Sequence, residues 1–192
     1  EQRRKRILFV GRMVEKKAPL LMIRAFADVR RVIPDAELAM IGDGPLLSDA
    51  KRLADDLAVP VMFLGARSSD EVLAQMHEAR VFCLPSIVAA NGDAEGFGLV
   101  LLEAQSCGVP VVSSALGGAD EGLLDEITGY KFDAGNIEDL VKRINALFDD
   151  SDKATRMSAA ASAFATKNFD VARLCETLEQ IYTNNSGHLV CT

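Results

Sequence analysis

Residues 91–108 read Asn-Gly-Asp-Ala-Glu-Gly-Phe-Gly-Leu-Val-Leu-Leu-Glu-Ala-Gln-Ser-Cys-Gly, a glycine-rich acidic loop followed by an apolar helix. Placing the turn at residues 96–98 puts Glu95 before the helix and Glu103 about two turns inside it, roughly 9 Å from the helix start along the axis. The N–H groups and the dipole at a helix start attract phosphate. The stretch therefore suits a ligand with hydroxyls at both ends and an anion between them, which is the layout of a sugar nucleotide.

Short apolar runs alternate with helical patterns on both sides of this stretch. The runs lack polar alternation, which is typical of strands buried on both faces. The sequence predicts strands at residues 7–10, 38–41, 61–64, 81–84, 109–113 and 129–132, and helices at residues 19–32, 46–57, 69–79 (capped by Ser69 or Asp70), 136–148, 152–167 and 170–183. This order indicates an α/β fold with a doubly wound parallel sheet and extra C-terminal helices. We expect one domain over residues 1–183 and a disordered tail over residues 184–192.

Composition limits the class of protein. The chain has 192 residues, 49% of them apolar, and a net charge of −7. A sizeable core is therefore feasible, and a nucleic-acid-binding protein, which needs a basic face, is disfavoured. No apolar stretch has the length of a membrane span, and no signal peptide is recognisable. The four cysteines lack metal-binding spacing, so we expect reduced thiols and a cytoplasmic location.

Residues that directly follow the strands are the candidates for ligand contact, because such sheets bind ligands at the carboxyl ends of their strands. Gly11 permits a tight turn, Arg12 offers a planar set of donors and Lys17 adds a mobile positive charge, so together they could neutralise a diphosphate. A Gly-Arg pair is also common after strands that bind nothing. Residues 42–44 (Gly-Asp-Gly) and 117–121 (Gly-Gly-Ala-Asp-Glu) are more typical of structural turns. No dinucleotide fingerprint and no P-loop sequence follows any strand.

The two glutamates each allow two interpretations. Glu103 lies in a row of apolar residues, so its carboxylate either reaches solvent or is buried with partners, because an unpaired buried charge is costly. The 2′- and 3′-hydroxyls of a ribose would be suitable partners, and a solvent-facing or capping glutamate is the alternative. Glu95 lies in a loop with Asp93, where a solvated acid is more common than a catalytic one.

Seven short motifs in the same order resemble one family: Gly-Arg-x-x-x-x-Lys, Ile-Gly-Asp-Gly-Pro, Phe-Leu-Gly, Pro-Ser, Glu-Gly-Phe-Gly-Leu-Val-Leu-Leu-Glu-Ala, Gly-x-Pro-Val-Val and Gly-Gly-x-x-Glu. Together they resemble the C-terminal, donor-binding domain of retaining glycosyltransferases of the GT-B fold, in the large family four group. The resemblance covers residues 7–183, and its specific part is the glutamate pair separated by seven residues.

The resemblance implies a role for each matching residue. Arg12 and Lys17 would bind the donor diphosphate, and Glu95 would contact hydroxyls of the transferred sugar. Glu103 would hold the ribose, and Arg67 would offer its backbone to the base. The remaining substrate-binding positions would be Gly11, Gly96 and the backbone N–H groups of Phe97, Gly98 and Leu99. Enzymes of this family need no metal ion, so we expect no metal and no cofactor beyond the nucleoside diphosphate sugar.

The implied reaction is transfer of a sugar to an acceptor hydroxyl with retention of configuration, in polysaccharide or glycolipid biosynthesis. Arg12, Lys17 and the helix start would stabilise the departing phosphate, with Glu95 as an orienting group. A whole enzyme of this kind has an N-terminal acceptor-binding domain, which this sequence lacks. We therefore expect a fragment that binds donor but does not transfer sugar alone. The resemblance also allows peripheral membrane association of the full-length enzyme.

Other interpretations stay open. The apolar stripe of the last helix (Phe169, Leu174, Leu178, Ile181 and Tyr182) either packs locally or favours self-association of the fragment. A sugar-nucleotide epimerase shares the fold and the ligand. A binding-only nucleotide-sugar domain is a further alternative, disfavoured by the intact charged residues, and a Rossmann dehydrogenase is disfavoured by the missing fingerprint. The donor base, the sugar and the acceptor are not determined by the sequence.

Overall fold

Alternate residues of the first strand, β1 (Arg6–Val10), enter two different cores, because both faces of the sheet are covered. The computed structural model describes residues 3–114 and 116–185. Its six-stranded sheet has the order β3-β2-β1-β4-β5-β6, and each pair of neighbouring strands is parallel. The other strands are β2 (Glu37–Ile41), β3 (Val61–Gly65), β4 (Val81–Leu84), β5 (Val111–Ser113) and β6 (Gly129–Lys131). This is the Rossmann-like topology that the sequence predicts.

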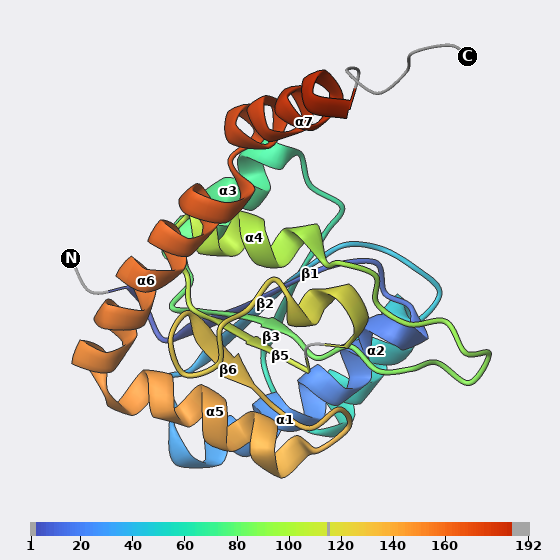
Figure 1. The fold of residues 1–192 in the computed structure, drawn as a ribbon. Helices are drawn as coiled ribbons and strands as arrows, with labels where there is room; N and C mark the ends of the chain where they lie inside the picture. Colours follow the sequence, from blue (N-terminus) through green and yellow to red (C-terminus); the bar gives the residue numbers. More distant parts are fainter. Residues whose placement is uncertain (1–2, 115, 186–192) are drawn as a thin grey trace.

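Helices lie on both faces of the sheet (Figure 1). One face carries α1 (Pro19–Val32), α2 (Leu47–Asp56) and α5 (Ile137–Asp149), and the other carries α3 (Ser69–Glu78) and α4 (Leu99–Ser106). Two short 3-10 helices, η1 (Glu15–Lys17) and η2 (Gly117–Asp120), lie in the loops that follow β1 and β5. The long helix α6 (Ser151–Phe169) packs on α4 and α5, and α7 (Val171–Asn185) follows it.

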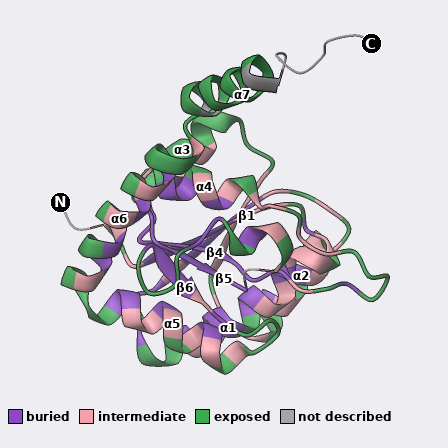
Figure 2. Ribbon diagram, in the orientation of Figure 1, coloured by how far each residue is buried: buried purple, intermediate pink, exposed green. Residues whose placement is uncertain are grey.

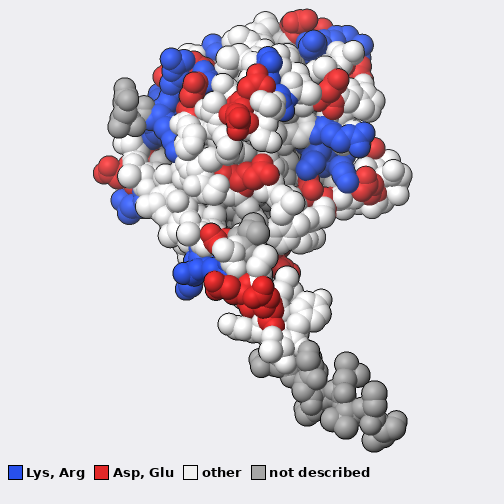
Figure 3. All heavy atoms as spheres, turned by 90° about the horizontal axis from the view of Figure 1, so that it is seen from above, with Lys and Arg blue, Asp and Glu red and all other residues white. Residues whose placement is uncertain are grey.

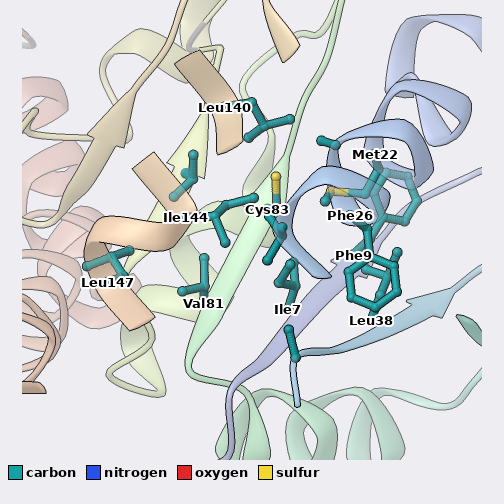
Figure 4. Close-up of a cluster of buried hydrophobic side chains, with 14 of the residues drawn as sticks. Ile7, Phe9, Met22, Phe26, Leu38, Val81, Cys83, Leu140, Ile144 and Leu147 are labelled. Atoms are coloured by element: carbon teal, nitrogen blue, oxygen red, sulfur yellow. The ribbon is translucent and has the colours of Figure 1, made fainter. Parts of the chain in front are cut away.

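The larger core lies between the sheet and the helices α1 and α5. Figure 4 shows Ile7 and Phe9 of β1 facing Met22 and Phe26 of α1, and Leu140, Ile144 and Leu147 of α5 beside β4. The second core contains Leu8, Phe82 and Leu84 with Leu101 and Ala104 of α4. In Figure 2 most of the strands are buried, while the outer faces of the helices are exposed. The edge strand β3 is only half-buried. The apolar runs without polar alternation are thus explained by burial on two faces.

The predicted strands and helices are confirmed, with corrections at their ends. Helix α4 begins at Leu99, after Gly98 in the left-handed region, so Glu103 lies about one turn inside the helix and not two. The cap of α3 is Ser68, not Ser69 or Asp70, and it forms a capping box with Glu71. Helix α7 extends to Asn185, two residues into the expected tail, and residues 186–192 lie outside the described part of the chain.

The apolar stripe at the end of the chain divides into two parts. Phe169 packs locally, since its ring lies 5.6 Å from that of Phe97 and 5.5 Å from that of Phe164. Leu178, which is 52% exposed, and Ile181 lie on the outer turns of α7. This helix extends away from the sheet in Figure 1 and is exposed in Figure 2. Among the described residues, no helix has the length and apolar character needed to cross a membrane.

Candidate functional site

The point where the strand order reverses lies between β1 and β4. The chain passes from β1 outward to β3 and then returns to β4, which pairs with β1 in parallel through Ile7 and Val81. The loops after these two strands, residues 11–18 and 85–98, therefore leave neighbouring strands at the same edge of the sheet. In open α/β sheets this crevice is the usual ligand site.

The loop after β1 is held by the loop after β2. Gly11 N–H donates to the carbonyl of Ile41 at 3.0 Å, and Met13 N–H donates to that of Asp43 at 2.9 Å. A Cβ atom on Gly42 would lie 2.0 Å from the Gly11 carbonyl oxygen, so the two backbones meet closely only because residue 42 is glycine. The Gly-Asp-Gly turn thus has a structural role, which is to position Gly11.

Lys17 and Glu95 form an ion pair at this edge, although they are 78 positions apart. The Lys17 ammonium donates to Glu95 Oε2, and the two side chains expose only 14% and 9% of their areas. A Cβ on Gly11 would contact the Lys17 side chain at 3.5 Å, so Lys17 crosses directly over this glycine. The structure therefore brings together three residues that the sequence assigns to the site.

Ser86, for which the sequence predicted no role, also contacts Glu95. Its hydroxyl donates to Glu95 Oε2 at 3.1 Å, and its carbonyl accepts from the Ser114 hydroxyl at 2.6 Å. Ser86 is buried and lies directly after β4, in the Pro-Ser motif. Its position at the carboxyl end of a central strand was the available signal, because such positions face the ligand crevice.

The segment between Ser86 and Glu95 is tied to η1. Ile87 N–H donates to the Lys16 carbonyl at 2.9 Å, and Ala90 N–H donates to the Glu15 carboxylate at 3.0 Å. The Lys16 ammonium pairs with Asp93 at 3.0 Å. These contacts join the two loops along their length, and Asp93 is already neutralised by a lysine.

Residues 96–99 form the start of α4. Gly98, the N-cap, has φ +71°, where glycine is favoured. The backbone N–H groups of Phe97, Gly98 and Leu99 make no hydrogen bond with the residues that the structure describes. The neighbouring carbonyl of Gly96 accepts from Ala119 N–H at 3.1 Å, which fixes this turn against η2. Three donors are thus available at a helix start, where an anion is stabilised.

Arg12 and Arg67 differ in whether their guanidinium groups are free to contact a ligand. The Arg12 side chain is exposed and makes no hydrogen bond or ion pair within the described part of the chain. The guanidinium of Arg67 pairs with Glu71 at 3.4 Å, beside a cavity of about 290 Å³ next to α3. Hydrogen bonds from Ser68 hold the pKa of Glu71 below its ordinary value. The predicted backbone contact of Arg67 with a base stays a prediction.

Glu103 lies outside the cluster around Glu95. Its side chain is exposed on α4 and lines a cavity of about 340 Å³ with Leu99, Leu102 and Phe169. Arg12, Lys17 and Glu95 do not line this cavity. The core-facing residues of α4 are Leu101, Ala104 and Gln105, and Glu103 therefore lies on the outer side of the helix. Glu103 thus faces solvent in this structure, and its contact with a ribose stays a prediction.

The described residues contain free thiols but no metal-binding cluster. No cluster of three or more His, Cys, Asp or Glu side chains there is arranged to hold a metal ion. Cys83, Cys107 and Cys175 are free thiols, and Cys191 lies outside the described residues. Burial raises the pKa of the Cys83 thiol, which lies in the core. Figure 3 shows acidic and basic side chains interspersed over the face that it draws.

Known proteins resemble this chain in sequence and in fold. A mannosyltransferase of Mycolicibacterium smegmatis, described as a GDP-mannose-dependent alpha-(1-6)-phosphatidylinositol monomannoside mannosyltransferase, is 36% identical over 179 residues, which are 90% of this chain and 47% of that protein. The chain thus spans about half the length of the curated relatives it matches. Alr3699/HepE of Anabaena, solved with UDP, superposes with a TM-score of 0.84 and 24% identity, over 94% of this chain and 49% of the other.

A shorter structure matches along most of both chains. The C-terminal domain of the group 1 glycosyl transferase LpcC from Francisella tularensis has a TM-score of 0.77 and 21% identity, and 86% of each chain is covered. The fold is therefore that of the Rossmann-like C-terminal half of GT-B glycosyltransferases. The family model described as glycosyl transferases group 1 matches residues 1–164, and the chain belongs to this family.

Proposed function

We propose that this chain is the donor-binding domain of a retaining glycosyltransferase that moves a sugar from a nucleoside diphosphate sugar to an acceptor hydroxyl. The observation that carries the proposal is the largely buried ion pair of Lys17 with Glu95, which lies next to the turn whose N–H groups are available. A carboxylate and a cation side by side at a strand-order reversal suit a ligand with hydroxyls next to an anion.

The diphosphate would contact donors from both loops. Arg12 offers an exposed guanidinium, Lys17 an ammonium with three donors, and Phe97, Gly98 and Leu99 offer backbone N–H groups. Glu95 would accept hydrogen bonds from hydroxyls of the transferred sugar. Gly11 and Gly96 would allow close approach of the ligand to the backbone.

Charge builds up on the departing phosphate oxygen during transfer, and donors fixed before the reaction stabilise it most effectively. Glu95 would orient the sugar and need not be a nucleophile. The acceptor hydroxyl would attack from the side of the leaving group, which retains the configuration. In a full-length enzyme, Glu95→Ala is expected to reduce turnover by roughly 10²–10³, the range for one such electrostatic group.

Glu103 and Arg67 would bind the nucleoside. The Glu103 carboxylate has no side-chain partner among the described residues, so it is available to accept from both ribose hydroxyls. Two such charge-assisted hydrogen bonds contribute about 1.5–3 kcal/mol each. The backbone of Arg67 would face the base, beside the cavity next to α3.

The proposal extends to the rest of the enzyme. An N-terminal domain would bind the acceptor, and peripheral association with a membrane would fit an acceptor that is a lipid. The location would be cytoplasmic. No metal ion takes part in the proposal, because Arg12, Lys17 and the start of α4 supply the positive charge that the diphosphate needs.

Calorimetric titration with GDP-mannose, UDP-glucose and ADP-glucose tests the proposal directly. GDP-mannose is the first candidate, because the M. smegmatis relative carries GDP-mannose in its name. We expect one member of the panel to bind at one site, and Arg12→Ala to weaken it about tenfold, the effect of losing one charge-assisted bond. Arg24→Ala, at an exposed arginine of α1, is the control and should leave the affinity unchanged. Equal affinities for all variants would refute the proposed site.

A further inference from the structure

Two arginines lie together at the amino-terminal edge of the sheet. The candidate donor site lies at the opposite, carboxyl-terminal edge. Arg80 directly precedes β4, and Arg3 lies shortly before β1. They line a cavity of about 210 Å³ with three hydroxyl side chains of α6, Ser151, Thr155 and Ser158. The other lining residues are uncharged. We call this the Arg3–Arg80 cavity.

Arg80 is a buried cation with unused donors. It is 6% exposed, and its Nε donates to the Leu147 carbonyl at 2.9 Å. Its Nη2 is buried and has no hydrogen-bond partner in the described residues. No carboxylate among those residues pairs with it, whereas the buried guanidinium of Arg6 pairs with both Glu37 and Glu78. A buried charge without a counter-charge is costly, so Arg80 points to a missing anion.

Arg3 brings a second positive charge without a carboxylate. Its guanidinium donates to the carbonyls of Gly108 and Cys107, both at 2.6 Å, at the C-terminal end of α4. Ser158 donates to the same Gly108 carbonyl, which ties α6 to this end of α4. Burial lowers the pKa of Arg3, which is the direction expected where a cation lacks a counter-charge. The cavity therefore holds two guanidinium groups and no acid.

We propose that the Arg3–Arg80 cavity binds the phosphate group of a small phosphorylated compound. Two guanidinium groups match the double charge of a phosphomonoester, and the unused donors of Arg80 and the Ser151 hydroxyl match its acceptor oxygens. The hydroxyls of Thr155 and Ser158 already donate to backbone carbonyls. The volume equals that of about seven liquid waters at roughly 30 Å³ each, which is enough for a phosphate with a short substituent. The start of α6 is not itself the site, because Asp150 already caps it by accepting from Lys153 N–H.

Calorimetric titration of the chain with inorganic phosphate and with glycerol 3-phosphate, at constant ionic strength, tests this proposal. We expect one site with a Kd on the order of 1 mM. At ten times the Kd, phosphate should raise the Tm by about 3–5 °C. Arg80→Met should weaken binding at least tenfold, and Arg156→Met, at an exposed arginine of α6, should leave it unchanged. Absence of saturable binding, or equal binding by Arg80→Met, would overturn the proposal.

Two further arms make the result unambiguous. Because Arg80→Met also removes the bond to Leu147, the double variant Ser151→Ala/Thr155→Val at exposed positions of α6 provides a second test, with a loss of at least threefold expected. Binding must persist in Arg12→Ala, since its loss there would place the phosphate in the donor site and refute the new site. Vesicles containing phosphatidic acid present the same group on a lipid. Sedimentation with them that Arg80→Met abolishes would assign the site to a headgroup, and binding of free phosphate alone would assign it to a soluble ligand.

Discussion

Breaking the pair of Lys17 with Glu95 should destabilise the domain far more than an exposed ion pair would. Lys17→Met keeps the length of the side chain and removes the ammonium, which leaves Glu95 with Ser86 as its described side-chain donor. Removing one partner of a buried pair costs about 3–5 kcal/mol, because the other charge stays buried. Since Ser86 still donates, we expect the lower end, about 3 kcal/mol. This corresponds to a fall in Tm of about 6–12 °C for a domain of this size.

A double-mutant cycle isolates the interaction. Glu95→Gln should also destabilise the domain by about 3 kcal/mol, because it leaves the Lys17 ammonium without its counter-charge. The double variant Lys17→Met/Glu95→Gln has no buried charge at either position, so the losses should not add. We expect a coupling energy of at least about 2 kcal/mol. Urea unfolding with an unchanged m value is the measurement, since a changed m would signal a different unfolded state.

The chain contains a matched control for this cycle. Lys16 and Asp93 join the same two loops, but their side chains are 29% and 54% exposed. The cycle of Lys16→Met with Asp93→Asn should give a coupling energy below about 1 kcal/mol, as for other solvent-exposed pairs. If the two cycles gave equal coupling energies, burial would not be what strengthens the inner pair, and the argument for Glu95 as a fixed carboxylate would fail.

Three other predictions test separate parts of the structure. Gly117→Ala should destabilise the domain by about 1 kcal/mol more than Gly135→Ala. Both residues have a positive φ, but of the two only Gly117 has a backbone atom in the way of a Cβ, the Glu95 carbonyl oxygen at 2.9 Å. Equal losses of stability in urea unfolding would contradict this. Excess EDTA should leave the initial rate of the full-length enzyme unchanged, and restoration of a lost rate by added Mg²⁺ would overturn the metal-free mechanism. Leu178→Glu should shift the chain toward monomer in sedimentation velocity if α7 mediates self-association, with Lys167→Glu on α6 as the control; a monomeric parent chain would reject self-association.

The central strands of the sheet could be predicted from the sequence because their residues face an apolar environment on both sides. Strands such as β4 are buried on both faces, so every position is apolar and the run is recognisable without its partners. Right-handed crossovers then place helices on both faces of the parallel sheet, but the order of the strands was not predicted. Helix ends were predicted less well, because Gly98 starts α4 through its backbone conformation and not through a capping side chain.

The candidate site could be predicted only in part. The positions of Gly11, Arg12 and Lys17 after β1 follow from the strand itself, but the contact of Lys17 with Glu95 depends on the fold of two separate loops. The outward direction of Glu103 was not predictable either. Helix α4 has eight residues and is apolar nearly all round, with Leu99 67% exposed, so no stripe marks its buried face.

The ion pair at the centre of the site also links the two chemical tasks that the proposed function requires. An ammonium group has three N–H donors, and Lys17 uses one on Glu95, so the others can reach a phosphate without breaking the pair. In the proposed function, a carboxylate held in this way would be fixed before the sugar arrives, which would avoid the entropy cost of ordering it during binding. The lysine would then hold the phosphate and the sugar-binding carboxylate at a constant separation. In this arrangement, one side chain would set the distance between the leaving group and the sugar hydroxyls. That side chain is Lys17, which extends from the loop after β1 to Glu95 in the loop after β4.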